Sequence, residues 1–227
     1  MQHTQDTSQI ANLAYRPFEQ RDFEPLAELV AHMWFADAAQ QAQPLLGAAE
    51  LSAHLRRHNW SQVACVDGVA RAAVLVALRG REDRRQHWDG VRHAYEERLH
   101  QLVGPHETNS QLELIDQEAR ASAHLASKGK PWADATIELL IVNPSLQGTG
   151  VGTRLLHAAC NHLRREGARG FYLMTDDGCD YGYYDHLGYA RVYQHESSYP
   201  GVANVYAYAH LLRQPQANEK ADSTSNS

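Results

Sequence analysis

A strand, a glycine-rich turn and a helix follow one another between residues 135 and 166, and this succession constrains the fold more than any other part of the chain. ATIELLIV (135–142) is almost entirely apolar, which is typical of a strand buried on both faces. GFYLMTD (170–176) follows the helix as a second strand. The order strand, helix, strand predicts an α/β sheet with one parallel, right-handed crossover.

The turn between the first strand and the helix carries Gly148, Gly150 and Gly152. Such a turn exposes backbone N–H groups at the positive end of a helix dipole, an arrangement that binds phosphate. A dinucleotide fingerprint G-x-G-x-x-G matches only in part, because Thr153 stands where a small residue is required, although Asp176 suits the end of the next strand. A nucleoside-triphosphate loop is excluded, since no lysine lies between 130 and 220. A glycine turn without any ligand is the remaining alternative.

The other predicted elements come from hydrophobic spacing and turn residues. A hairpin is expected at 61–80 around Asp67-Gly68, a pair suited to a type I′ turn. The remaining expectations are a short strand within 12–23, a helix from near Asp22 to Trp34, a helix over 48–58, a helix over about 150–166, a short helix ending at Gly188, and strands at 189–197 and 203–212.

The segment 81–131 is predicted to form a helical hairpin, with Gly104-Pro105 between its two helices. Each helix has one narrow apolar stripe and an outer face rich in charged residues. The stripes are formed by Trp88, Val91, Tyr95, Leu99 and Leu102, and by Leu112, Ile115, Ala119 and Leu125. Extending the core is the expected role of this hairpin, with a cover for a substrate site or a dimer contact as alternatives. Trp88 and Tyr95 are the residues expected to contact a substrate or partner in those cases.

Composition narrows the class of protein. The 227 residues carry a formal net charge of −6 and no long basic run, so a nucleic-acid partner is not expected. The three cysteines form no CxxC pair, and His157 and His162 are not four residues apart, so no disulfide framework or metal site is predicted. No signal peptide or membrane span is evident, which favours a cytoplasmic protein. Residues 1–10 and 214–227 are predicted to be disordered tails around a single domain, 11–213.

Two motifs together carry a family resemblance. Gln147 to Gly152 reads Q-x-x-G-x-G, and YYDHLGY (183–189) stands where a motif of the form L-Y-x-x-x-G-F would follow. The chain resembles the GNAT N-acetyltransferase superfamily over roughly 12–80 and 134–212, most closely over 136–192. The resemblance implies an α/β, layered fold: a mixed, mostly antiparallel sheet of about six to seven strands flanked by helices, with 81–131 as an insert.

The resemblance also implies a ligand. Acetyl-CoA would be the acyl donor, with its pyrophosphate held by backbone N–H groups of Gln147, Gly148, Thr149, Gly150, Val151, Gly152 and Thr153. Its pantetheine arm would pair with the strand edge at Leu140 and Val142, and a backbone N–H near Ile141 or Val142 would face the thioester carbonyl as oxyanion donor.

Tyr184 is the implied general acid, because it matches the family's tyrosine and a phenol stays protonated at neutral pH. Packing is the alternative role, although Tyr183 and Leu187, four residues apart, are expected to form the core pair of this helix. Glu138, the only charged residue of its strand, is the candidate base. Two alternatives stay open. A chain of water molecules could act as the base, or Glu138 could lie at a frayed strand end, where a neighbouring residue or solvent satisfies its carboxylate.

Acidic residues surround the second motif. Asp177 replaces an asparagine that often contacts the cofactor in the family, so it is not expected in that role. Asp176, Asp177 and Asp180 are candidates for a cationic acceptor pocket or for capping the short helix. Cys179 is not favoured as a nucleophile, because no histidine partner is evident.

The function expected from these residues is acetyl transfer from acetyl-CoA to an amine by direct attack. The alternatives are an acyl-CoA-binding sensor without turnover and, more weakly, a nicotinamide oxidoreductase. The expected partner is a small-molecule or peptide amine, and a homodimer stays open; neither nucleic acid nor a membrane is expected.

Overall fold

A seven-stranded sheet forms the centre of the protein, as seen in a computed structural model that describes residues 10–81, 85–179, 181–196 and 203–213. The strand order is β1-β2-β3-β4-β5-β7-β6, and every neighbouring pair is antiparallel except β4 and β5. The predicted mixed, mostly antiparallel sheet is therefore confirmed. The expected disordered tails lie outside the described residues, apart from Ile10.

The strands agree closely with the sequence patterns. They are β1 (Leu13–Arg16), β2 (Trp60–Val66), β3 (Val69–Leu78), β4 (Ala135–Val142), β5 (Gly170–Asp176), β6 (Ala190–His195) and β7 (Val205–Leu211). Asp67 and Gly68 both have positive φ, 51° and 81°, as the turn between β2 and β3 requires.

The main helices are α1 (Phe23–Trp34), α2 (Gln43–Arg57), α3 (Arg85–Val103), α4 (Pro105–Ala126), α5 (Val151–Arg165) and α6 (Gly182–His186). α2 begins at Gln43 rather than at residue 48, because Pro44 suits the first turn of a helix and Leu46 is already buried. The predicted helical hairpin is present as α3 and α4, which are separated at Gly104.

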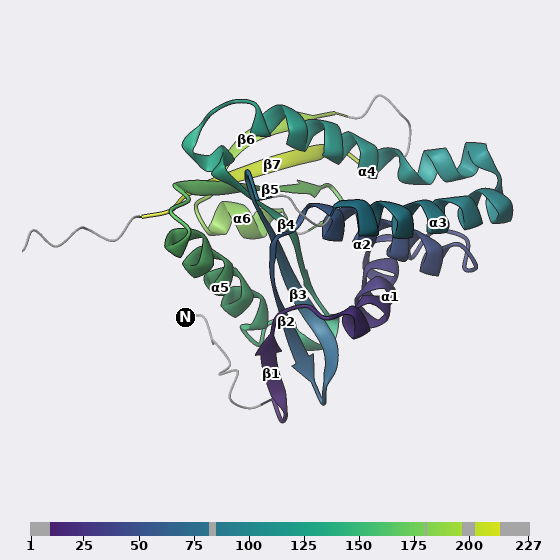
Figure 1. Ribbon diagram of the computed structural model, residues 1–227, viewed down its shortest axis with the longest axis horizontal. Helices are drawn as coiled ribbons and strands as arrows, with labels where there is room; N and C mark the ends of the chain where they lie inside the picture. Colours follow the sequence, from purple (N-terminus) through teal and green to yellow (C-terminus); the bar gives the residue numbers. More distant parts are fainter. Residues whose placement is uncertain (1–9, 82–84, 180, 197–202, 214–227) are drawn as a thin grey trace, which may run out of the picture.

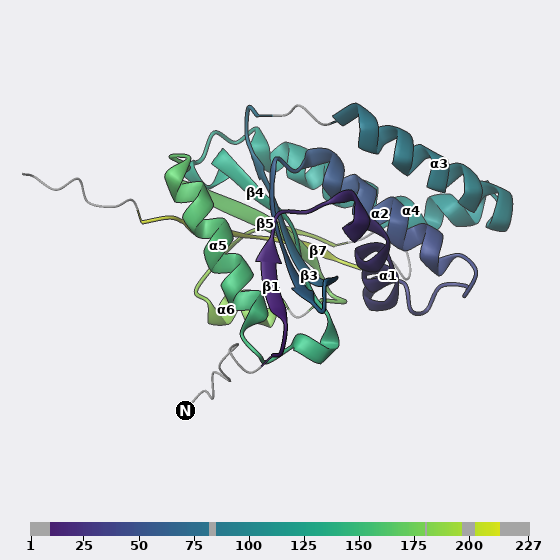
Figure 2. The ribbon, with the colours of Figure 1, turned by 60° about the horizontal axis from the view of Figure 1, so that its bottom comes forward.

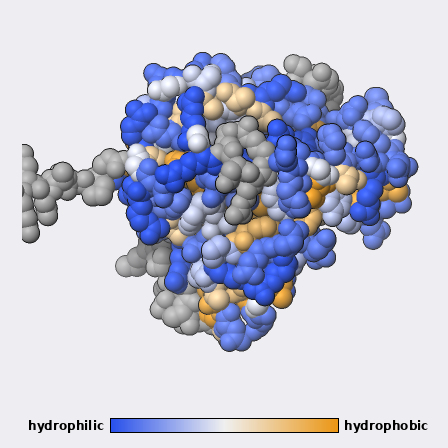
Figure 3. Space-filling view, in the orientation of Figure 1, coloured by the Kyte–Doolittle hydropathy of each residue, from blue (hydrophilic) through white to orange (hydrophobic). Residues whose placement is uncertain are grey.

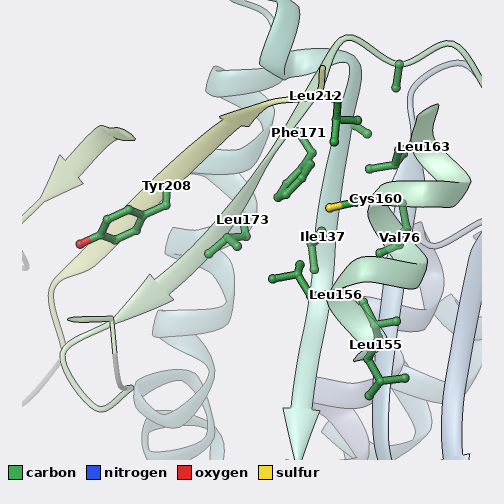
Figure 4. Packing of buried hydrophobic residues seen from close by; sticks show 14 of the residues in the cluster. Val76, Ile137, Leu155, Leu156, Cys160, Leu163, Phe171, Leu173, Tyr208 and Leu212 are labelled. Carbon is green, nitrogen blue, oxygen red and sulfur yellow. The ribbon is translucent and has the colours of Figure 1, made fainter. Parts of the chain in front are cut away.

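The helices cover both faces of the sheet (Figures 1 and 2). α5 packs on one face, where Leu155, Leu156 and Leu163 meet Val76 and Ile137 of the sheet (Figure 4). α1, α2 and α3 pack on the other face, against Leu75 and neighbouring residues. α4 covers β5 and β7 on the same side of the sheet as α1 and α2. Leu125 of α4 packs on Tyr172, whereas the residues on either side of Tyr172, Phe171 and Leu173, point to the opposite face, toward α5.

The α3–α4 hairpin extends the core. Trp88 is 5% exposed and stacks on Phe23 with ring centroids 5.4 Å apart, so it is a core residue. Leu99 is fully buried against α2. Leu102 was expected on the same buried stripe, but it is 39% exposed. The reason is its place near the end of α3, where the hairpin projects beyond the other helices (Figure 1). The space-filling view shows that projection as mostly hydrophilic with small hydrophobic areas (Figure 3).

A β-bulge interrupts β4. Leu75 of β3 pairs with Leu139 and the next residue, Val76, pairs with Ile137, so Glu138 has no partner on β3. The extra residue changes which face the strand presents. Ile137 faces the α5 side of the sheet, whereas Leu139 and Ile141 face the side of α1 and α2. The bulge therefore sets the direction of the side chain at 138.

Candidate active site

The glycine turn forms the N-terminus of α5. Gly148 and Gly150 have φ values of 74° and 83°, in the left-handed region that glycine adopts at little cost. A Cβ on Gly152 would stand 3.3 Å from Cγ2 of Val142, so the helix packs closely on the end of β4. Gln147 and Gly148 are exposed.

The backbone of this turn leaves donors free. Thr149 N–H donates to the carbonyl of Leu146 (3.3 Å), and Arg154 N–H to the carbonyl of Gly150 (3.0 Å). In the part of the chain that the structure describes, the N–H groups of Gly148 and of residues 150–153 donate to no protein acceptor. Clustered free N–H groups at a helix N-terminus form a site for a phosphate or another anion. Two of the predicted donors are not free, because Gln147 N–H donates to the carbonyl of Pro144 (3.2 Å) and Thr149 N–H to that of Leu146. Phosphate binding by the remaining N–H groups stays a prediction.

β4 and β5 separate beside this turn. They pair only through Thr136 with Tyr172 and Ile137 with Leu173, and then diverge toward their carboxyl ends, as the two strand arrows show (Figure 4). The β5 side of β4 from residue 138 to 142 has no strand partner among the described residues. This free edge contains Leu140 and Val142, the predicted pantetheine contacts, and Ile141, which with Val142 was predicted to offer the oxyanion donor. The turn lies close to this edge, because a Cβ on Gly152 would stand 3.3 Å from Cγ2 of Val142.

Glu138 lies at the start of the divergence, within the strand rather than at a frayed end. Its side chain is 4% exposed, and Nε of Arg57 from α2 lies 2.6 Å from its Oε2. The predicted base is therefore already held in a buried ion pair. Arg57 also places a guanidinium N–H₂ 3.4 Å from Nδ1 of His54.

Tyr184 lies on α6 and contacts the α5 side of the core. Its ring stacks with Tyr189 at 6.1 Å and lies 5.6 Å from the ring of Tyr208. The expectation that Tyr183 and Leu187 form the core pair is wrong, since Leu187 is 40% exposed. The helix is only five residues long, and it turns Tyr184 toward the core instead. Packing is thus an observed role of Tyr184, and its role as an acid stays a prediction.

The acidic residues after β5 have separate partners. Asp176 Oδ1 accepts a hydrogen bond from Gly178 N–H (2.6 Å), and Asp177 Oδ1 accepts one from the Tyr206 hydroxyl (2.6 Å). The latter bond lowers the pKa of the Asp177 carboxyl. Neither carboxylate caps α6, whose N-cap is Tyr181. Asp180 lies outside the described residues.

Cys179 is a poor nucleophile. Burial, followed by the charge of Asp176, raises the pKa of its thiol to about 12, so the thiol stays protonated at neutral pH. Its Sγ lies 3.8 Å from Oδ2 of Asp176. The sequence argument against a covalent route through Cys179 agrees with this environment.

Sequence reasoning missed Arg57 and also Glu118 of α4, whose pKa is raised well above its usual value by burial and by the charge of Glu50. Arg57 is 81 residues from Glu138 in the sequence. It is the second of two arginines at the end of α2, a pattern typical of a basic helix terminus exposed to solvent. Glu118 lies on a helix rich in acidic residues, where nothing in the spacing distinguishes it. The one available signal was its position on the face of the helix that also carries Ile115 and Leu125.

The described residues lack both a metal-binding cluster and a membrane-spanning helix. They contain no group of three or more histidine, cysteine, aspartate or glutamate side chains arranged to hold a metal ion. Among the same residues, no helix combines the length and the apolar character needed to cross a membrane.

Comparisons with known proteins agree with this geometry. Residues 81–189 match the model of the acetyltransferase (GNAT) family. No curated protein sequence matches the chain. Among solved structures, a protein from Desulfovibrio desulfuricans assigned to the GNAT family is similar at 13% identity and a TM-score of 0.53, over 88% of this chain and 99% of the other.

Two more solved structures are similar to the same extent. The ribosomal-protein-S18-alanine N-acetyltransferase of Escherichia coli has 14% identity and a TM-score of 0.52, over 91% of this chain and 97% of its own. An aminoglycoside 6′-N-acetyltransferase in complex with coenzyme A has 12% identity and a TM-score of 0.52, over 89% and 98%. At these identities the likeness concerns the fold. Residues 81–189 thus carry the match to the GNAT acetyltransferase family model, and the solved structures of similar fold include GNAT acetyltransferases.

Proposed function

We propose that the protein transfers an acetyl group from acetyl-CoA to the amine of a small molecule or peptide. The observation that carries this proposal is the glycine turn, with its free N–H groups, at the open end of the diverging strands β4 and β5. A phosphate site and an unpaired strand edge next to each other suit a ligand with a pyrophosphate and an amide-bearing arm. Coenzyme A has both, and a solved structure of similar fold contains it.

The residues present fit this donor. The free N–H groups of Gly148 and of residues 150–153 would hold the pyrophosphate, and the edge of β4 at Leu140 and Val142 would pair with the arm. A backbone N–H near Ile141 or Val142 would then stabilise negative charge on the thioester oxygen. Only backbone atoms serve in these contacts, so apolar side chains can occupy the strand.

The reaction requires two proton transfers. The lone pair of the amine attacks the thioester carbon, the C–N bond forms and the C–S bond breaks. The proton that the nitrogen loses goes to Glu138, directly or through a water, and the leaving thiolate takes a proton from Tyr184. Glu138 has a competing structural role, because Arg57 already pairs with it. The pH profile of Glu138→Gln separates the two roles: loss of a base removes the acidic limb of kcat/KM, whereas a structural role lowers activity equally at each pH.

Thiol release from acetyl-CoA across a panel of amines, amino acids, aminoglycosides and peptides tests the proposal. The matched variants are Gly150→Arg, which fills the phosphate turn, and Gly167→Arg, which has a similar φ of 79° at the other end of α5 and open space around it. We expect Gly150→Arg to abolish binding of coenzyme A and Gly167→Arg to retain it. Equal affinity in both variants would show that the turn does not hold the pyrophosphate.

Tyr184→Phe tests the acid, because phenylalanine keeps the ring against Tyr189 and Tyr208 and removes only the hydroxyl. Turnover should fall at least tenfold with coenzyme A affinity unchanged. The structural roles of Tyr184 and Glu138 favour one competing function, an acyl-CoA-binding protein without turnover. Tight binding of acetyl-CoA combined with no thiol release from any acceptor would support that function instead.

A further inference from the structure

The short helix α6 carries the proposed acid, Tyr184, but it is attached to the protein by few contacts. None of its five residues, all of which the structure describes, is buried. The Tyr184 ring rests on β7, where it lies 5.6 Å from the ring of Tyr208. A helix of this length gains little stability from its own hydrogen bonds, so its position depends on contacts with other elements.

Arg191 of β6 contacts α6 and β7 at once. In the sheet it stands directly opposite Tyr208, so the two side chains lie on the same face. Its Nη2 and Nε donate to the Tyr208 hydroxyl at 2.6 and 3.1 Å, and Nη2 lies 3.6 Å from Oδ2 of Asp185 on α6. One guanidinium therefore links the helix to the strand residue on which the Tyr184 ring rests.

Tyrosine rings hold the guanidinium in this place. Its central carbon lies 5.5 Å from the ring centroid of Tyr181, the N-cap residue of α6, and 4.9 Å from that of Tyr206 on β7. Both distances suit a cation–π contact. Arg191 thus contacts the start of α6 through Tyr181 and the helix itself through Asp185.

A surface ion pair is the alternative role of Arg191. Its side chain is 37% exposed and that of Asp185 is 52% exposed, so their pairing contributes little to the free energy of unfolding. Proton donation depends on position more sharply than folding does, because a displacement of about 1 Å can lower a catalytic rate roughly 100-fold. A contact that is weak in folding can therefore still control turnover.

Resting on the proposed function, we propose that Arg191 is a positioning residue for Tyr184. It holds α6 against β7 and thereby fixes the Tyr184 hydroxyl where the leaving thiolate of coenzyme A takes its proton. Arg191 acts on the reaction only through Tyr184. Its removal should consequently lower kcat and leave KM for acetyl-CoA unchanged.

Arg191→Met tests this, since methionine keeps part of the apolar stem and removes every donor. Arg120→Met makes the same change on α4, where Arg120 is 64% exposed and pairs with Glu113, and serves as control. We expect kcat to fall at least tenfold in Arg191→Met and to stay unchanged in Arg120→Met. A rise in KM for acetyl-CoA with kcat unchanged would overturn the proposal.

The same change in a Tyr184→Phe background separates positioning from general damage. If Arg191 acts through the Tyr184 hydroxyl, adding Arg191→Met to Tyr184→Phe should lower kcat less than twofold further. A merely structural role would instead produce the same fall in both backgrounds. Equal falls in the two backgrounds, or no fall in either, would contradict a positioning role.

Hydrogen exchange of the α6 amides, followed by mass spectrometry, gives a measurement that does not depend on turnover. Exchange should be at least threefold faster in Arg191→Met than in the unaltered protein and in Arg120→Met. Tyr208→Phe removes only the hydroxyl that accepts from Arg191, so it should also speed exchange in α6 and lower kcat. This variant decides the matter if Arg191→Met does not fold.

The two measurements also separate this proposal from the proposed function. Faster exchange in α6 of Arg191→Met, in a protein that releases no thiol with any acceptor, would leave the hold of Arg191 on α6 in place and contradict acetyl transfer. Thiol release by the unaltered protein, with kcat and α6 exchange both unchanged in Arg191→Met, would contradict the role of Arg191 and leave acetyl transfer in place.

Discussion

The ion pair between Arg57 and Glu138 provides the most demanding test of the structure. We expect Arg57→Met to destabilise the protein, because methionine fills part of the space of the arginine stem but leaves Glu138 without its partner. The Glu138 side chain is 4% exposed and that of Arg57 is 28% exposed. Breaking a buried pair costs about 3–5 kcal/mol, and the partial exposure of Arg57 places the expected loss near the lower end, at about 3 kcal/mol.

The neighbouring residue supplies the control. Arg56 pairs with Asp89 at 2.9 Å, but both side chains are more than 40% exposed, at 41% and 45%. Arg56→Met should therefore cost less than about 1 kcal/mol. In a domain of this size about 3 kcal/mol corresponds to a fall in Tm of roughly 6–12 °C, and about 1 kcal/mol to roughly 2–4 °C. Thermal unfolding followed by circular dichroism measures both.

A double-mutant cycle gives the interaction itself. Glu138→Gln combined with Arg57→Met should cost about 2 kcal/mol less than the sum of the two single changes, because the double variant contains no unpaired charge at this position. The loss in Arg57→Met should also shrink at acidic pH, where the carboxylates facing the vacated position become protonated. If Arg57→Met is no more destabilising than Arg56→Met, the ion pair is not buried as described and the reasoning fails.

Three further predictions concern the core, a thiol and a surface ion pair. Leu99→Ala should lower the free energy of unfolding by about 3 kcal/mol, since Leu99 is fully buried. Leu102→Ala, at a 39% exposed position, should lower it by less than about 1 kcal/mol. Urea unfolding measures both, and similar losses would contradict the packing of α3. Cys179, with its pKa raised to about 12, should resist iodoacetamide at pH 8 in the folded protein and react in urea, as mass spectrometry will show; rapid alkylation of the folded form would contradict its burial. Hydrogen bonds from Arg169 lower the pKa of Asp134, so their stabilising effect should be complete above the ordinary pKa of aspartate and disappear as the pH falls through the lowered value. The difference in Tm between the unaltered protein and Arg169→Met should accordingly narrow below pH 4, and a constant difference would refute this assignment.

Most of the fold could be predicted from local patterns. The strand, glycine turn and helix between 135 and 166 were placed correctly because each depends on residues close in sequence. The hairpin at Asp67-Gly68 was placed correctly for the same reason. The prediction that the Leu102 side chain is buried was wrong. Burial depends on where a helix ends relative to its neighbours, and the spacing of apolar residues along the helix does not give that information.

The candidate site was predictable only in its backbone part. Free N–H groups at the glycine turn follow from local conformation, and those of Gly148 and of residues 150–153 are free, whereas those of Gln147 and Thr149 donate within the turn. The partner of Glu138 was not predictable, because Arg57 reaches it from a helix 81 residues away. Tyr184 faces the core because α6 is a short helix, whose orientation is set by the strands on either side and not by its own spacing.

The bulge at Glu138 makes β4 a strand with two phases. Before it, odd-numbered side chains such as Ile137 belong to the core under α5; after it, odd-numbered side chains such as Leu139 and Ile141 belong to the core under α1 and α2. Deleting Glu138 itself would restore regular alternation and keep Ile137 and Leu139 on their present faces, whereas deleting a residue after the bulge, such as Leu140, would turn Ile141 from the face under α1 and α2 to the face under α5. Any comparison or grafting of this strand between relatives must consequently be aligned on the bulge, and residue counts measured from either end of the strand would place the remaining side chains on the wrong face.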